Sequence, residues 1–224
     1  MVNVLILSGT GRYADPWHPF DETSAIVADL LREAGHEVEI SGDVEERLAD
    51  LDGIDLLVVN AGNPTRHGLD SPTAAAAREG LHAYRVRGGG VLSLHVSAGS
   101  LPEVPEWREI MGGYWEQGVT MHPDNSLTTL EVAASEHPVV AGLEDFQTFD
   151  ERYSWLVVAD DVEPLLFHEH DGVRHPILWT RTDQYGGRVV YDALGHDPRA
   201  YESAGTRALI TRAAAWILDR PTPE

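Results

Sequence analysis

The stretch GGGVLSLHVSAGS, residues 88–100, joins a glycine triplet to an apolar run, then to a histidine and small residues. An uninterrupted apolar run of this length is typical of a strand buried on both faces of a parallel sheet. Open α/β sheets bind their ligands at the carboxyl ends of such strands. His95 stands at that end, so we expect it to lie in the functional site.

Similar units surround this strand. Apolar or alternating runs predict further strands, and apolar residues at helical spacing predict helices between them, in the order strand, helix, strand. This order is typical of a parallel sheet with right-handed crossovers. The expected strands are 2–9, 36–41, 55–62 and 90–96, and the expected helices are 21–35 and 71–90.

The second half of the sequence is less regular. Residues 100–125 are rich in Pro, Gly and Trp and predict a long loop with one short helix at 107–111. Later strands, several of them short and antiparallel at one edge, are expected at 126–133, 156–170, 175–181 and 187–195, before a final helix at 208–219. No linker divides the chain, so residues 1–224 are expected to form one α/β domain.

Charge and cysteine content limit the function. The 37 acidic and 16 basic residues give a net charge of −21, which disfavours nucleic acid and anionic membranes as partners and favours a neutral or cationic small molecule. The absence of cysteine excludes disulfides, thiolate metal ligands and thiol nucleophiles. With no signal peptide and no apolar run of about 18 residues, the expected location is the cytoplasm.

Two motifs match known patterns incompletely. GTGRYA, residues 9–14, fits a dinucleotide-binding pattern, but prolines follow where a helix should open on the phosphates, so we interpret it as a sharp loop. HVSAG, residues 95–99, is similar to a hydrolase nucleophile elbow with His95 in place of the first glycine. An ordinary serine hydrolase is therefore disfavoured, and Ser97 either shapes the turn or contacts the substrate.

The sequence contains eleven histidines, and three of them stand at the expected carboxyl edge of the sheet: His95, His122 and His196. None has the i, i+4 spacing of a helical metal pair, so a zinc or manganese site made from these three positions is an alternative that spacing alone does not support. The other histidines are expected in solvated or turn positions, including His168, which flanks a turn, and His175, which precedes a proline.

An acidic stretch, FDERYSW at residues 149–155, places Asp150 and Glu151 beside Tyr153 and Trp155. A carboxyl group beside aromatic rings can have a raised pKa and act as a general acid or base, and rings bind sugars. A surface turn anchored by the aromatic side chains is an equally good interpretation of the residues by themselves.

Three ordered segments resemble the ThuA-like, or trehalose-utilisation, family. They are GGGVLSLHVSAGSLPEVPEWREIMGGYW followed by MHP, then HPVVAGLEDFQTFDERY, and then HPILWTRTDQYGGRVVYDALGHD. The resemblance covers nearly the whole chain and implies a flavodoxin-like three-layer sandwich with a mostly parallel central sheet, related to class I glutamine amidotransferases. Those enzymes use a cysteine that this chain lacks, so glutaminase activity is excluded.

The resemblance also implies site residues and a substrate class. The shared motif positions are His95, His122, Asp150, Glu151, Tyr153 and His196, with Trp17 and His18 in a looser match. The family is associated with trehalose and related disaccharides, often beside sugar dehydrogenases that make 3-keto sugars.

Three hypotheses follow. The first is a sugar or keto-sugar enzyme in which His95 and His122 exchange protons, Glu151 or Asp150 assists, His196 contributes, and Trp17, Trp115 and Tyr153 stack on the sugar. The second is a zinc- or manganese-dependent hydrolase or isomerase at the same histidines. The third is a protein that binds a sugar or a partner dehydrogenase without chemistry. Separately, the terminal helix is a candidate surface for a homo-oligomer, and packing on the sheet is an equally good interpretation of it.

Overall fold

The fold is a nine-stranded mixed sheet flanked by helices, seen in a computed structural model that describes residues 2–68 and 71–219. The strand order within this part of the chain is β2-β1-β3-β4-β11-β10-β9-β6-β7. The parallel half contains β1 (Asn3–Ser8), β2 (Glu37–Ser41), β3 (Leu56–Asn60), β4 (Gly90–Leu94) and β11 (Arg188–Asp192). This architecture confirms the expected α/β class.

The antiparallel half extends the sheet beyond β11 and has more strands than the sequence indicates. It consists of β10 (Val173–Thr182), β9 (Glu163–His170), β6 (Ser126–Val132) and β7 (Phe146–Asp150). The expected strand at 156–170 is interrupted by a turn at residues 160–161. Its first part is β8 (Val157–Val158), which pairs with β5 (Gly113–Tyr114) in a separate ribbon, and its second part is β9. The single-strand prediction for this segment is therefore wrong.

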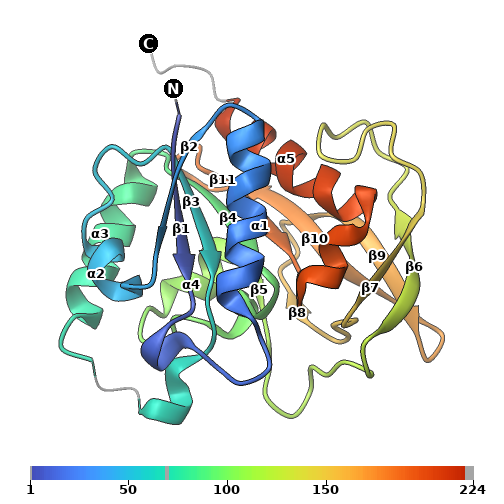
Figure 1. Ribbon diagram of the computed structural model, residues 1–224, viewed down its shortest axis with the longest axis horizontal. Coiled ribbons are helices and arrows are strands. Elements are labelled where there is room, and N and C mark those ends of the chain that lie inside the picture. The colour runs from blue at the N-terminus through green and yellow to red at the C-terminus, as the bar shows by residue number, and fades with distance from the viewer. Residues whose placement is uncertain (1, 69–70, 220–224) are drawn as a thin grey trace.

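Helices cover the sheet. In Figure 1, α1 (Phe20–Glu33) and α5 (Ala204–Leu218) lie side by side on the near face, and they contact each other. The remaining helices are α2 (Val44–Ala49), α3 (Ala74–Val86) and α4 (Glu106–Met111), with α2 and α3 packed together and α4 on β11 and β5. The six-residue α2 was not expected, because so short a helix has little periodicity to recognise.

The glycine triplet before β4 has a packing role. A Cβ at Gly89 would overlap the ring of Tyr84 in α3, and one at Gly90 would overlap Ile217 in α5. Both helices therefore approach the start of β4 closely, which seats the strand at the centre of the core. β3 and β4 are buried along their whole length, as their continuous apolar runs predict.

Two histidines differ from expectation. His168 lies in β9 and His175 in β10, and their exposed fractions are 2% and 4%. They lie opposite each other in the paired strands, and residues 153–155 pack against them: His168 Nε2 lies 2.9 Å from the Tyr153 carbonyl oxygen, and the Trp155 N–H donates to His175 Nδ1. The expectation of solvated or turn positions for them is wrong.

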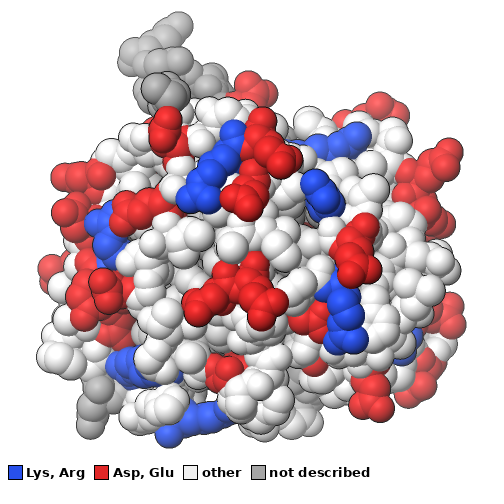
Figure 2. Space-filling view, in the orientation of Figure 1, with Lys and Arg blue, Asp and Glu red and all other residues white. Residues whose placement is uncertain are grey.

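Acidic and basic side chains are interspersed on the face shown in Figure 2, with acidic groups in excess over that face. Among the described residues, no helix combines the length and the apolar character needed to cross a membrane.

Candidate functional site

His95 begins a 3-10 turn, His95–Gly99, directly after β4. Its φ is 45°, in the left-handed region that is rare and costly for residues other than glycine. The neighbouring strand β11 holds it there: Tyr191 donates a hydrogen bond of 2.9 Å to the His95 carbonyl oxygen, and the imidazole Nδ1 lies 2.7 Å from the Ala193 carbonyl oxygen. The strained residue of this elbow is thus His95 and not Ser97.

These contacts fix the tautomer of His95. A carbonyl oxygen can only accept, so Nδ1 donates to Ala193 and Nε2 presents its lone pair to the neighbouring side chains. Burial lowers the pKa of His95 to about 4. His95 is therefore a neutral imidazole near pH 7, the form that binds a metal ion or accepts a proton.

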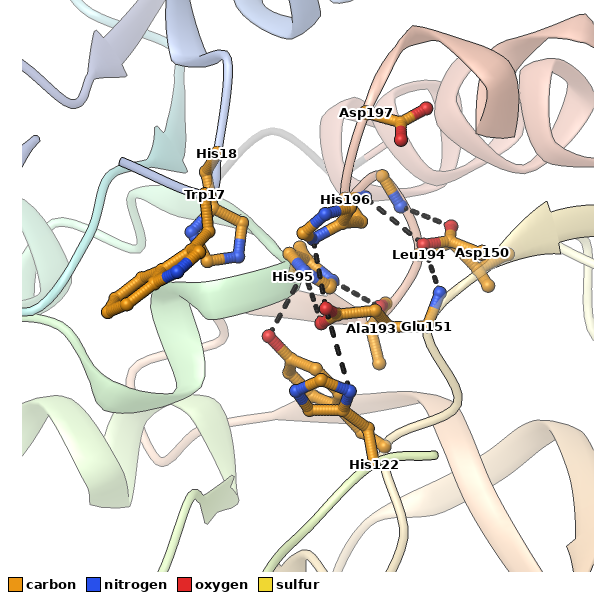
Figure 3. A network of polar contacts seen from close by, with 12 residues as sticks. Trp17, His18, His95, His122, Asp150, Glu151, Ala193, Leu194, His196 and Asp197 are labelled. Carbon is orange, nitrogen blue, oxygen red and sulfur yellow. Dashed lines mark hydrogen bonds and ion pairs between the residues drawn. The ribbon is translucent and has the colours of Figure 1, made fainter. Parts of the chain in front are cut away.

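His95 belongs to a group that we call the histidine–glutamate cluster: His18, His95, Glu151 and His196. One ligand atom from each lies within 4.8 Å of the others. Glu151 follows β7, and its two carboxylate oxygens lie 3.4 Å from His95 Nε2 and 3.3 Å from His196 Nδ1. His18 follows β1, His95 follows β4 and His196 follows β11, and Figure 3 shows these side chains gathered around Glu151. The cluster thus lies at the carboxyl edge of the parallel half.

Glu151 and His196 shift each other's pKa in opposite directions. Burial alone raises the pKa of Glu151, but contacts with His196 and His95 outweigh it and hold the pKa below its ordinary value. Burial alone lowers the pKa of His196, but the Glu151 carboxylate outweighs it and raises the pKa. This pair favours an ionised carboxylate in the middle of the histidines.

Asp150 is turned away from the cluster (Figure 3). Its carboxylate accepts hydrogen bonds from the backbone N–H groups of Glu151, Gly195 and His196 at 2.7–3.2 Å. Burial raises its pKa to about 7 despite these bonds. Asp150 does not line the cavity described below, and its contacts fix the backbone that carries Glu151 and His196.

His18 joins the cluster from the loop after β1. Its Nδ1 lies 2.7 Å from both carboxylate oxygens of Asp15, a residue that the sequence analysis did not select. Its Nε2 is buried and has no hydrogen-bond partner among the described residues, and the same is true of His196 Nδ1. The signal that could have found Asp15 is an Asp three residues before a His in a proline-containing loop.

A cavity of about 690 Å³ opens above the cluster. Trp17 lies at its rim, 57% exposed, with the Arg66 guanidinium 3.8 Å from its ring centre. Tyr153 lies deeper and its hydroxyl is 3.1 Å from His95 Nε2. The lining residues include Asp15, Trp17, His18, Asn63, Arg66, Trp115, Gln117, His122, Glu151, Tyr153 and His196.

His122 and Ser97 also lie outside the cluster. His122 lines the cavity with its side chain about one-third exposed, and its Nδ1 is 3.5 Å from Glu151 and 3.0 Å from the Pro123 carbonyl oxygen. Ser97 is fully buried, its hydroxyl is 2.6 Å from that of Ser93, and it does not line the cavity. Of these two residues, His122 therefore faces the cavity and Ser97 does not.

The cluster fits a divalent metal ion. Three imidazoles and one carboxylate are ligands that zinc and manganese accept. Ligand atoms of one tetrahedral zinc ion, each about 2.0–2.1 Å from the metal, lie about 3.3–3.4 Å apart, so the atoms of the cluster, which lie within 4.8 Å of one another, must draw closer together to share one. His18 takes the place that the sequence analysis gave to His122 among the metal candidates.

Comparisons with known proteins agree with this architecture. A crystal structure of a ThuA-like protein from Parabacteroides merdae is 19% identical, with a TM-score of 0.79 over 100% of this chain and 93% of that chain. A ThuA-like protein from Bacteroides uniformis gives 19% and 0.77 over 98% and 92%. A glutamine amidotransferase from Thermotoga maritima is 10% identical, with a TM-score of 0.57 over 98% and 99%. These likenesses show the fold.

No curated protein sequence matches the chain. The family described as "ThuA: Trehalose utilisation" matches residues 3–217, which is nearly all of the sequence. The chain therefore belongs to the ThuA family.

Proposed function

We propose that the protein is an enzyme acting on a disaccharide or a 3-keto sugar, and that the histidine–glutamate cluster holds a divalent cation, zinc or manganese, beneath the substrate. The family supports the sugar as ligand. The cavity has room for a disaccharide and is lined by aromatic and polar side chains, as sugar sites are.

The observation that carries this proposal is the convergence of acceptor atoms. His95 Nε2 presents a lone pair because its Nδ1 donates to Ala193, and Glu151 is an ionised carboxylate 3.4 Å away. His18 Nε2 is buried and lacks a hydrogen-bond partner among the described residues, and His196 Nδ1 lies 3.3 Å from Glu151. A cation among these atoms would use the lone pairs of the imidazoles and the Glu151 carboxylate, and it would replace the proton that His196 shares with Glu151.

The cluster and His122 would then have different roles in the reaction. A bound cation would act as a Lewis acid on an oxygen of the substrate. His122, partly exposed at the cavity wall, takes a proton from the carbon next to the 3-keto group. The electron pair then forms an enolate, and its collapse expels the glycosidic oxygen, which takes up the proton that His122 carries. Positioned acid/base groups of this kind contribute about 10²- to 10⁴-fold each.

Elemental analysis of untagged protein after dialysis tests the metal. We expect about one zinc or manganese ion per chain in the wild type and less in Glu151→Gln and His95→Gln variants. A variant of the exposed Asp124, Asp124→Asn, is the matched control and should keep the metal. A wild type that binds neither ion during titration would refute the cation part of the proposal.

A screen of trehalose, maltose, sucrose and their 3-keto derivatives tests the substrate. Ligand binding raises the thermal midpoint by mass action, so no knowledge of the reaction is needed. Product analysis follows for each sugar that shifts the midpoint. We expect His122→Ala to keep the shift and lose turnover; unchanged turnover would remove His122 from the mechanism.

A metal-free acid/base site is the second candidate. It is favoured by Tyr153, whose hydroxyl donates to His95 Nε2 and so occupies the lone pair that a cation would need. In this case the ion pair of Glu151 and His196 supplies the proton. Turnover that survives chelation and dialysis would select this candidate.

A further inference from the structure

The loop between β1 and α1 is organised by one side chain, Asp15. Its Oδ1 accepts hydrogen bonds from the backbone N–H groups of Trp17 and His18 at 2.9 and 3.0 Å. Both carboxylate oxygens also lie 2.7 Å from Nδ1 of His18. The side chains of Asp15 and His18 are 6% and 11% exposed, so water does not compete effectively for these bonds.

The Asp15 carboxylate is an acceptor in these contacts, because it faces the backbone N–H groups of Trp17 and His18 as well as the His18 ring nitrogen. An ionised carboxylate can only accept hydrogen bonds, so the proton of this contact belongs to Nδ1 of His18. In the neutral imidazole the lone pair is then on Nε2.

Nε2 of His18 faces the other histidines. The His18 ring centre lies 5.0 Å from that of His95 and 4.9 Å from that of His196, in edge-to-face arrangements. This nitrogen is buried and lacks a hydrogen-bond partner among the described residues, and because Nδ1 is bound to Asp15, Nε2 is the atom that His18 has left to offer to the cluster. Metal-binding histidines are commonly oriented by a carboxylate on the other ring nitrogen in this way.

We infer that Asp15 is a positioning residue: it fixes His18 in the Nδ1–H tautomer and aims the Nε2 lone pair into the histidine–glutamate cluster. This inference deepens the proposed function and uses the same site. It explains why Asp15 and His18 share one short loop: the carboxylate sets both the backbone turn and the ring. The substrate-facing Trp17 lies between them and is placed by the same carboxylate.

The first test measures the tautomer directly in metal-free protein. Long-range ¹H–¹⁵N correlation spectra distinguish the two neutral imidazole tautomers, and the His18 signals are assigned by their loss in His18→Gln. We expect wild-type His18 to be the Nδ1–H form. A wild type with the proton on Nε2 overturns the inference, whether or not the protein binds a metal.

The second test uses Asp15→Asn. The amide oxygen still accepts the two backbone N–H groups, while the amide NH₂ donates to Nδ1 and moves the ring proton to Nε2. We expect the tautomer to change and the affinity for Zn²⁺ or Mn²⁺, measured by titration calorimetry, to fall about 10- to 100-fold. Asp21→Asn, an exposed carboxylate in the first turn of α1, is the matched control and should change neither.

The outcomes separate the two proposals. Wild-type protein that binds no metal but shows the Nδ1–H tautomer refutes the cation in the proposed function and keeps the role of Asp15. An Asp15→Asn variant that retains both the tautomer and the metal affinity of the wild type overturns the role of Asp15, with the metal site intact. An equal loss of metal affinity in Asp15→Asn and Asp21→Asn also overturns it.

Discussion

Replacing Asp150 should reduce the stability of the fold and not only turnover. Its carboxylate is 1% exposed and accepts hydrogen bonds from the backbone N–H groups of Glu151 (2.8 Å), Gly195 (2.7 Å) and His196 (3.2 Å). Alanine leaves these three donors without a partner. Each stranded buried donor costs about 1–3 kcal/mol, and water entering the vacated space offsets part of the sum, so we expect Asp150→Ala to lose about 3–6 kcal/mol.

Asparagine should cost less. One oxygen remains and can accept from Glu151 and His196, which share Oδ1, while the amide NH₂ faces the Gly195 N–H that used Oδ2. One stranded donor gives an expected loss of about 1–3 kcal/mol for Asp150→Asn. The order Ala, then Asn, then wild type in increasing stability is therefore part of the prediction.

Urea unfolding at pH 8, followed by tryptophan fluorescence, gives the free energy of unfolding of each variant. The exposed Asp124 provides the control, and Asp124→Ala should lie within about 0.5 kcal/mol of the wild type. If Asp150→Ala matches that control in stability and still loses turnover, Asp150 acts on the substrate, and the positioning role is refuted.

Three further predictions concern titration, the cluster and the elbow. Burial raises the pKa of Asp192 to about 8 from 3.8, so the native state keeps a proton that the unfolded chain releases. Stability should fall as pH rises from about 4 to 8, by up to about 1.4 kcal/mol per pH unit. Asp192→Asn should lessen the fall of the urea-unfolding free energy over that window, and the raised pKa of Asp150 accounts for part of what remains; an unchanged slope would show that Asp192 is ionised in the fold. Glu151→Gln should lower the pKa of His196 in an NMR titration, because it removes the carboxylate that raises it; an unchanged titration would contradict the ion pair. Ser97→Ala should keep turnover and lose about 1 kcal/mol of stability with the Ser93 hydrogen bond, whereas a large fall in kcat would assign Ser97 a chemical role.

The parallel half of the sheet could be predicted from the sequence because its signals are local. The strands at 90–96 and 55–62 are continuous apolar runs, and the structure buries β4 and β3 completely. His95 could be placed at the carboxyl edge for the same reason. The antiparallel half was harder, since burial there depends on contacts between distant segments, such as that of His168 with the Tyr153 carbonyl oxygen.

The site was predictable in its members but not in its arrangement. The sequence indicated His95, Glu151 and His196, yet which imidazole nitrogens face one another depends on contacts across the fold, such as that of His95 with Ala193. Asp15 was missed because a lone aspartate in a loop has many roles. Ser97 was selected by motif position, but only backbone geometry shows that the strained residue of the elbow is His95.

The long sequence separation within the cluster has a consequence for folding. His18 follows the first strand and His196 the last, so the site closes only after β11 has inserted between β4 and β10. Contacts of such high contact order form late and slowly. During synthesis the ribosome must release nearly the whole chain before the four side chains can meet. Occupation of the cluster would therefore report completed folding, and chains truncated before β11 would lack the site even where the first strands and helices had collapsed.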